Sequence, residues 1–124
     1  MKKGSFILML CLLSGCSPII SSDKKAAIKE KAIRIVEYAI ADDYEPLIKE
    51  GSMNFRRSVT PEMMQAEKDK WPDVYGDFEM IDSCDIIMRD TLYIANVSVN
   101  FEHYKQMFML ALDSNLNLQG LTLK

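Results

Sequence analysis

Leu-Tyr-Ile-Ala-Asn-Val-Ser-Val-Asn-Phe, residues 92–101, is the stretch that decides the fold of this chain. Apolar side chains occupy every second position, namely Tyr93, Ala95, Val97, Val99 and Phe101. The positions between them hold Asn96, Ser98 and Asn100, preceded by Leu92 and Ile94. Successive side chains of a β-strand point to opposite faces, so this alternation predicts a strand with one buried face and one mixed, exposed face.

Three further strands are predicted around this one. Residues 78–89 precede it across a short turn, and their buried face is expected to hold Phe78, Met80, Cys84, Ile86 and Met88. Residues 107–112 and 118–123 follow it. Connections of a few residues favour antiparallel neighbours, so we expect a four-stranded meander. Asp82 and Gly120 interrupt the pattern and are predicted sites of a bulge or bend, and Gly120 also suits a close approach of another backbone.

The residues before this sheet have a helical period. Ile28, Ala32, Ile35 and Ala39 recur at spacings of three and four, which predicts a helix over 24–41 capped by Ser22 or Asp23. A second helix is predicted over 44–50 with Asp43 as its cap, and a third starts at 60–62 and is stopped by Pro72. Phe55 is expected in the core between them. The predicted fold class is α+β, a single domain (24–124) with N-terminal helices packed on a curved four-stranded antiparallel sheet meander.

The N-terminus has the layout of a secretory signal. Lys2 and Lys3 precede an apolar run over 6–13, which is too short for a membrane-spanning helix. Leu13-Ser14-Gly15-Cys16 resembles the lipobox of bacterial lipoproteins. The resemblance implies a signal peptide (1–15) cleaved between Gly15 and Cys16, a lipid on Cys16 and a short tether (16–23). It also implies a cell-envelope location, lipid-anchored on the extracytoplasmic side of a bacterial membrane, the outer membrane if the cell is Gram-negative.

Charge and cysteine content narrow the classes of partner and fold. The chain has 15 basic and 18 acidic residues and a formal net charge of −3. A mildly acidic protein gains little from phosphate contacts, so no nucleic-acid partner is predicted. Cys84 is the one cysteine that follows Cys16. If Cys16 carries a lipid, no pair remains for an intramolecular disulfide.

The order of several local motifs resembles a known family. Ala-Asp-Asp-Tyr-Glu-Pro-Leu (41–47) follows the first helix, Thr-Pro-Glu (60–62) starts a later one, and Trp71 and Tyr-Gly-Asp-Phe (75–78) precede the meander. Over residues 24–124 this order resembles the bacterial domain-of-unknown-function family 3887. The resemblance implies a cystatin-like or nuclear-transport-factor-2-like fold, which often forms dimers through its exposed sheet face. It implies no catalytic residues, because the family has no agreed active site.

Six residues are predicted as a possible pocket or interface: Trp71, Tyr75, Phe78, Asp82, Tyr93 and His103. The aromatic residues near the turn into the sheet suit either the core or the rim of a pocket. Asp82 is costly to bury without a partner, which favours an edge or bulge position, and His103 is expected in a turn between strands. His103 is the only histidine, and no cysteine pair has ligand spacing, so no metal or cofactor is predicted.

These observations favour a membrane-anchored envelope lipoprotein whose non-catalytic domain binds a small ligand or a partner protein. No enzyme is predicted, because no catalytic motif is visible. The alternatives are a small enzyme that uses a pocket between helices and sheet, with Asp82 or His103 as acid or base, and an accessory subunit of an envelope complex. A homodimer is also expected, through the exposed sheet face that carries Leu92, Ile94, Asn96, Ser98 and Asn100.

Overall fold

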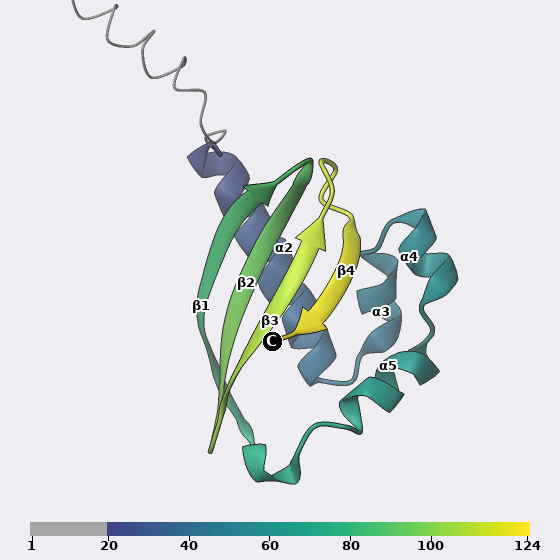
Figure 1. Ribbon diagram of the computed structural model, residues 1–124, viewed down its shortest axis with the longest axis vertical. Coiled ribbons are helices and arrows are strands. Elements are labelled where there is room, and N and C mark those ends of the chain that lie inside the picture. The colour runs from purple at the N-terminus through teal and green to yellow at the C-terminus, as the bar shows by residue number, and fades with distance from the viewer. Residues whose placement is uncertain (1–19) are drawn as a thin grey trace, which may run out of the picture.

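A computed structural model describes residues 20–124 of the chain (Figure 1). The predicted signal peptide, its cleavage between Gly15 and Cys16 and the lipidation of Cys16 lie outside the described residues. The helices are α2 (Ser22–Ile40), α3 (Tyr44–Lys49), α4 (Met53–Ser58), α5 (Pro61–Lys68) and the 3₁₀-helix η1 (Asp73–Tyr75). The strands are β1 (Phe78–Arg89), β2 (Leu92–Phe101), β3 (Lys105–Leu112) and β4 (Leu118–Leu123). Among residues 20–124, no helix is long and apolar enough to cross a membrane.

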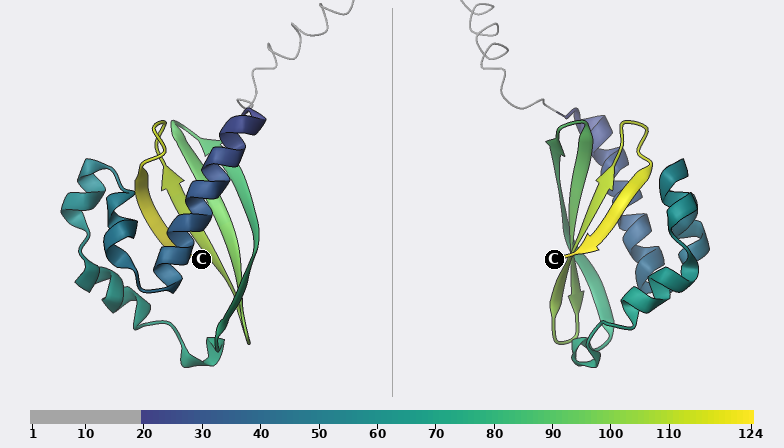
Figure 2. Two further views of the ribbon diagram at one scale, coloured as in Figure 1. Left: turned by 180° about the vertical axis from the view of Figure 1, so that it is seen from behind. Right: turned by 45° about the vertical axis from the view of Figure 1, so that its right-hand side comes forward.

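The predicted α+β fold class is confirmed. The four strands form one sheet in the order β1-β2-β3-β4, and each neighbouring pair is antiparallel. Figure 2 shows α2 lying across one face of this sheet, while α3, α4 and α5 stand beyond the β4 edge. Helices that follow one another in sequence therefore cover the inner face and one side of the sheet.

The alternation in β2 places its apolar face on the core as predicted, but Ile94 and Ser98, on the face predicted to be exposed, are buried as well. Ala95, Val97 and Val99 have no exposed surface and face the buried stripe of α2. That stripe consists of Ile28, Ala32, Ile35, Val36 and Ala39. The inner face of β3 continues the core with Phe108, Leu110 and Leu112. Apolar burial between α2 and the inner face of the sheet thus holds the sheet in place.

The prediction for the buried face of β1 is wrong in part, because two bulges change its parity. The pairing with β2 shifts between Phe78 and Met80 and again between Ile81 and Ser83, which leaves Glu79 and Asp82 as extra residues. The bulge predicted at Asp82 is therefore confirmed. The shifts turn Ile81 toward the core and leave Met80 52% exposed on the outer face.

The irregularity expected at Gly120 lies one residue earlier. Ala111 pairs with Gly120 and Leu112 with Leu118, so Gln119 is the extra residue of β4. An added Cβ at Gly120 would meet no atom within 4 Å. The last strand does carry a bulge, but one residue before the predicted position, and the close approach of another backbone predicted at Gly120 is wrong.

The helix boundaries correct several predictions. Helix α2 begins at Ser22, and Ser21 caps it by accepting a bond from the Lys24 amide at 3.2 Å, so the capping by Ser22 or Asp23 was wrong. The helix thereby includes the last two residues of the predicted tether. Helix α5 begins at Pro61 as predicted, with Thr60 accepting from the Met63 amide at 3.2 Å, but it ends at Lys68, before Pro72.

Candidate functional site

An apolar cleft lies between α5 and the inner face of the sheet near β4. It has a volume of about 460 Å³. Its walls come from the end of α2, from α3 to α5 and the residues after them, and from β3 and β4. The lining residues are Ala39, Tyr44, Phe55, Val59, Met63, Met64, Glu67, Lys68, Trp71, Phe108, Leu121, Thr122 and Leu123. Most of these side chains are apolar, which is the usual character of a small-molecule or peptide site.

Trp71 forms an aromatic wall of this cleft. Its ring lies edge-on to Phe108, with centroids 5.7 Å apart, and edge-on to Phe101 at 5.9 Å. Phe108 is almost fully buried, so the wall is anchored in the core of the sheet. Trp71 is also the only tryptophan of the chain. Its fluorescence therefore reports directly on the cleft.

Helix α5 forms the outer wall and is held mainly by polar contacts. None of its residues is buried, although Met63 and Met64 turn toward the cleft. At its last residue, the Lys68 ammonium donates to the carbonyl of Ala39 at 3.2 Å and to that of Ile40 at 2.6 Å. These carbonyls belong to the last turn of α2, where a cation is favourable. Lys68 therefore ties α5 to the C-terminal end of α2.

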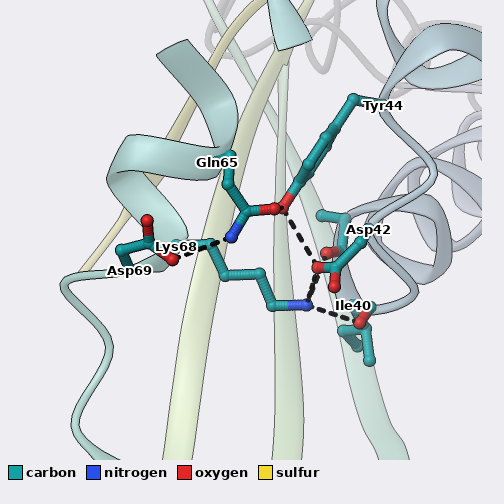
Figure 3. A network of polar contacts seen from close by, with 7 residues as sticks. Ile40, Asp42, Tyr44, Gln65, Lys68 and Asp69 are labelled. Atoms are coloured by element: carbon teal, nitrogen blue, oxygen red, sulfur yellow. Dashed lines mark hydrogen bonds and ion pairs between the residues drawn. The ribbon is translucent and has the colours of Figure 1, made fainter. Parts of the chain in front are cut away.

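Asp42 joins this contact between the helices (Figure 3). It has a positive φ of 60° and its carboxylate accepts a bond from Lys68, which lowers the pKa of Asp42 below its ordinary value. The Tyr44 hydroxyl lies 3.0 Å from Asp42 Oδ1 and 3.1 Å from Gln65 Oε1, so it donates to one of them at a time. Burial, and then the bond to Asp42, raise the pKa of Tyr44 to about 12.

The charged residues of the cleft are already paired within the chain. The three N–H groups of Lys68 have three acceptors, and its ammonium also lies 5.2 Å from the centroid of the Trp71 ring. Glu67 pairs with Lys70 at 3.0 Å. A ligand in the cleft therefore meets apolar surface rather than a free charge. No group of three or more metal-ligating side chains occurs among the described residues, 20–124.

Of the six residues predicted as pocket or interface, Trp71 is the one that lines this cleft. Tyr75 lies next to it, half-buried, with ring centroids 6.4 Å apart, and stacks on Tyr104 at 4.4 Å. Phe78 is 42% exposed and contacts Phe101 edge-on at 6.3 Å. Trp71, Tyr75 and Phe78 therefore belong to one aromatic cluster, and of these three Trp71 is the residue that lines the cleft.

The other three residues lie away from the cleft. Asp82 sits in its bulge and accepts a bond from Lys105 at 3.1 Å. His103 is exposed in the turn between β2 and β3, as predicted, with its Nε2 3.8 Å from a Glu102 oxygen. Tyr93 pairs with Leu112 on the inner face, and the Lys24 ammonium lies 5.7 Å from its ring centroid. The structure does not bring Asp82 and His103 to the cleft, so the enzyme alternative based on them gains no support.

The outer face of the sheet has the mixed character expected from the sequence. Met80 and Ile87 are 52% and 44% exposed there, while Ile94 and Ser98 are buried among their neighbours. The Asn96 Oδ1 atom is buried and has no hydrogen-bond partner among residues 20–124. The homodimer expected through this face stays a prediction.

Two features of the cleft were missed by reasoning from sequence. Helix α4 was not predicted, although Ser52 is a capping residue three positions before Phe55, whose amide it binds at 3.2 Å. The tie between Lys68 and the end of α2 joins residues that are 28 and 29 positions apart. Helical period and capping motifs describe one element at a time, so neither could have located that contact.

Comparisons with known proteins support the fold alone. No protein-family model matches the chain, and no curated protein matches it at a significant level. One solved structure, the NMR structure of a protein from Ruminococcus gnavus ATCC 29149, is similar, with 21% sequence identity and a TM-score of 0.66. The match covers 86% of this chain and 96% of that one. The chain therefore shares its fold with that protein.

Proposed function

We propose that this chain is a membrane-anchored binding domain, and that its apolar cleft holds an apolar ligand or an apolar segment of a partner protein. The cleft of about 460 Å³ between α5 and β4 is the observation that carries this proposal. Both of its charged residues are paired internally, so an uncharged, apolar occupant fits it best. Membership of the family 3887 and a non-catalytic role are parts of the same proposal.

A neutral fluorescent probe, N-phenyl-1-naphthylamine, tests the cleft. We expect it to bind the full chain carrying Cys16→Ser and to quench Trp71 by energy transfer. Met63→Glu should weaken binding about tenfold, because a carboxylate then interrupts the apolar wall. Met53→Glu is the matched control, since Met53 and Met63 are 56% and 52% exposed but Met53 does not line the cleft. Equal affinities of the two variants would show that the cleft is not the binding site.

The membrane anchor is proposed from the sequence Leu13-Ser14-Gly15-Cys16. Cys16→Ser removes the thiol that the lipid would occupy, so more than nine-tenths of the protein is expected to move from the membrane fraction to the soluble fraction. Acyl chains supply most of the membrane affinity of such an anchor, about 0.8 kcal/mol for each buried methylene. Cys84→Ser is the control and should leave the protein with the membrane. If Cys16→Ser also stays there, the anchor is not at this position.

A further inference from the structure

The two edges of the sheet differ in how they are protected. The β1 edge carries two bulges and exposed acidic side chains at Glu79, Asp82 and Asp85, which discourage pairing with another strand. The β4 edge has its one bulge at Gln119, and no charged side chain follows from Gly120 to Leu123. That uncharged part of the edge lies against the cleft, because the last three residues of β4 line it. The β4 edge is therefore the one suited to accept another strand.

The chain itself already pairs with the start of this edge. Gly51 forms a parallel bridge with Leu118, the first residue of β4. The Ser52 amide donates to the Leu118 carbonyl at 2.9 Å, and the Leu118 amide donates to the Glu50 carbonyl at 2.9 Å. Helix α4 begins immediately afterwards, and no strand of residues 20–124 continues along the rest of β4. A short segment thus starts a fifth strand that the described chain does not complete.

The remaining edge of β4 presents backbone groups beside the cleft. The Lys124 amide donates to the Met107 carbonyl across the ladder, at 2.9 Å. Backbone direction alternates along an antiparallel strand, so the N–H and C=O groups of Leu121 and Leu123 point away from β3. The side chains of these two leucines line the cleft. A strand placed alongside them would send every second side chain into the cleft.

We propose that the β4 edge and the cleft together bind an extended, uncharged peptide segment with an apolar side chain at every second position. The segment adds to the sheet as a fifth strand beyond Gly51. Backbone hydrogen bonds to Leu121 and Leu123 supply its alignment, and the apolar cleft selects its side chains. This inference rests on the proposed function, because it assigns the occupant of the same cleft.

A blocked hexapeptide of alternating valine and threonine is the probe for this inference, titrated against the full chain carrying Cys16→Ser. Binding is expected to change Trp71 fluorescence and to slow hydrogen exchange at the amides of Leu121 and Leu123. Only every second residue of an added strand points its N–H and C=O groups toward β4. Backbone N-methylation of one alternate set, the valines or the threonines, should therefore weaken binding at least tenfold, while methylation of the other set is tolerated.

A pair of variants at Leu123 isolates the backbone contact. Leu123→Pro removes an N–H that points to the open side and leaves the bonds to β3 in place. It is expected to bind the peptide about fivefold more weakly than Leu123→Ala, which loses the same side chain but keeps the N–H. Equal affinities of the two variants, or equal effects of the two methylated peptides, would show that the peptide is not held as a strand.

The outcomes separate this inference from the proposed function. If the neutral probe quenches Trp71 and the hexapeptide does not bind, the cleft holds small apolar molecules and the strand addition is wrong. If neither binds, the proposed function is wrong as well. If Leu121 and Leu123 are already protected in a sedimenting dimer that Leu123→Pro dissociates, the edge pairs with a second copy of the chain rather than with a peptide.

Discussion

Replacing Phe108 with alanine is expected to lower the free energy of unfolding by about 3–5 kcal/mol. Phe108 is 1% exposed and lies on the inner face of β3, where it pairs with Val97 on one side and Leu123 on the other. The substitution removes a buried ring and leaves a cavity beside Trp71, whose ring centroid is 5.7 Å away. Small domains have only about 5–15 kcal/mol of stability in total, so this variant is expected to be marginal.

Phe78→Ala is the matched control for Phe108→Ala. It makes the same chemical change at a side chain that is 42% exposed at the start of β1, so a loss of about 1 kcal/mol is expected. Urea unfolding followed by far-ultraviolet circular dichroism measures the free energy of unfolding of both variants. This signal does not depend on the surroundings of Trp71, which Phe108→Ala alters. Equal losses in the two variants would mean that the core described between β3 and α2 is not the main source of stability.

The sheet could be predicted from sequence because each strand carries its own signal. The alternation at 92–101 assigns every side chain of β2 to a face without knowledge of its neighbours. The same reasoning failed for Met80, because a bulge adds a residue and reverses the faces beyond it. Asp82 marked the place of the bulge, but a second one at Glu79 had no comparable mark in the sequence.

Apart from Trp71, the lining of the cleft could not be predicted, because it is assembled from distant parts of the chain. Its lining extends from Ala39 to Leu123 and includes residues of six separate elements and of the segments that join them. Phe55 was expected in the core, but α4, the six-residue helix that positions it, has too few apolar residues to show a period. The sequence indicated that Trp71 lies either in the core or at the rim of a pocket. Its contacts with Phe108 and Lys68 show that it packs against the core and also lines the cleft.

Lys68→Met is expected to lower the free energy of unfolding by about 2 kcal/mol. Methionine keeps an unbranched side chain beside Trp71 but removes the ammonium that binds Asp42 and the carbonyls of Ala39 and Ile40. Hydrogen bonds from a charged donor contribute about 1.5–3 kcal/mol. The Asp42 carboxylate that loses Lys68 is half exposed, so water can take the place of the ammonium and limit the loss. Lys70→Met is the control: its pair with Glu67 is mostly exposed, and a loss below about 0.5 kcal/mol is expected.

The pH dependence of the stability lost in Lys68→Met shows how much of the loss comes from the contact with Asp42. The bond from Lys68 lowers the pKa of Asp42 below its ordinary value of 3.8, so the native state favours the ionised carboxylate. Stability from that contact is present above the unfolded-state pKa and is lost as the pH falls through the folded-state value. The difference between the wild-type chain and Lys68→Met should therefore be largest near neutral pH and shrink below about pH 4. A difference that stays constant down to pH 2 would assign the loss to the carbonyl contacts alone.

The same variant should loosen the wall of the cleft. Helix α5 has no buried residue, so once Lys68 no longer ties it to α2, it keeps the contact of Gln65 with Tyr44 and the apolar contacts of Met63 and Met64. N-phenyl-1-naphthylamine is therefore expected to dissociate from Lys68→Met about tenfold faster than from Lys70→Met. Stopped-flow measurement of Trp71 energy transfer to the probe gives both rates. If the rates are equal while the stability differs, the contact stabilises the fold without controlling entry to the cleft.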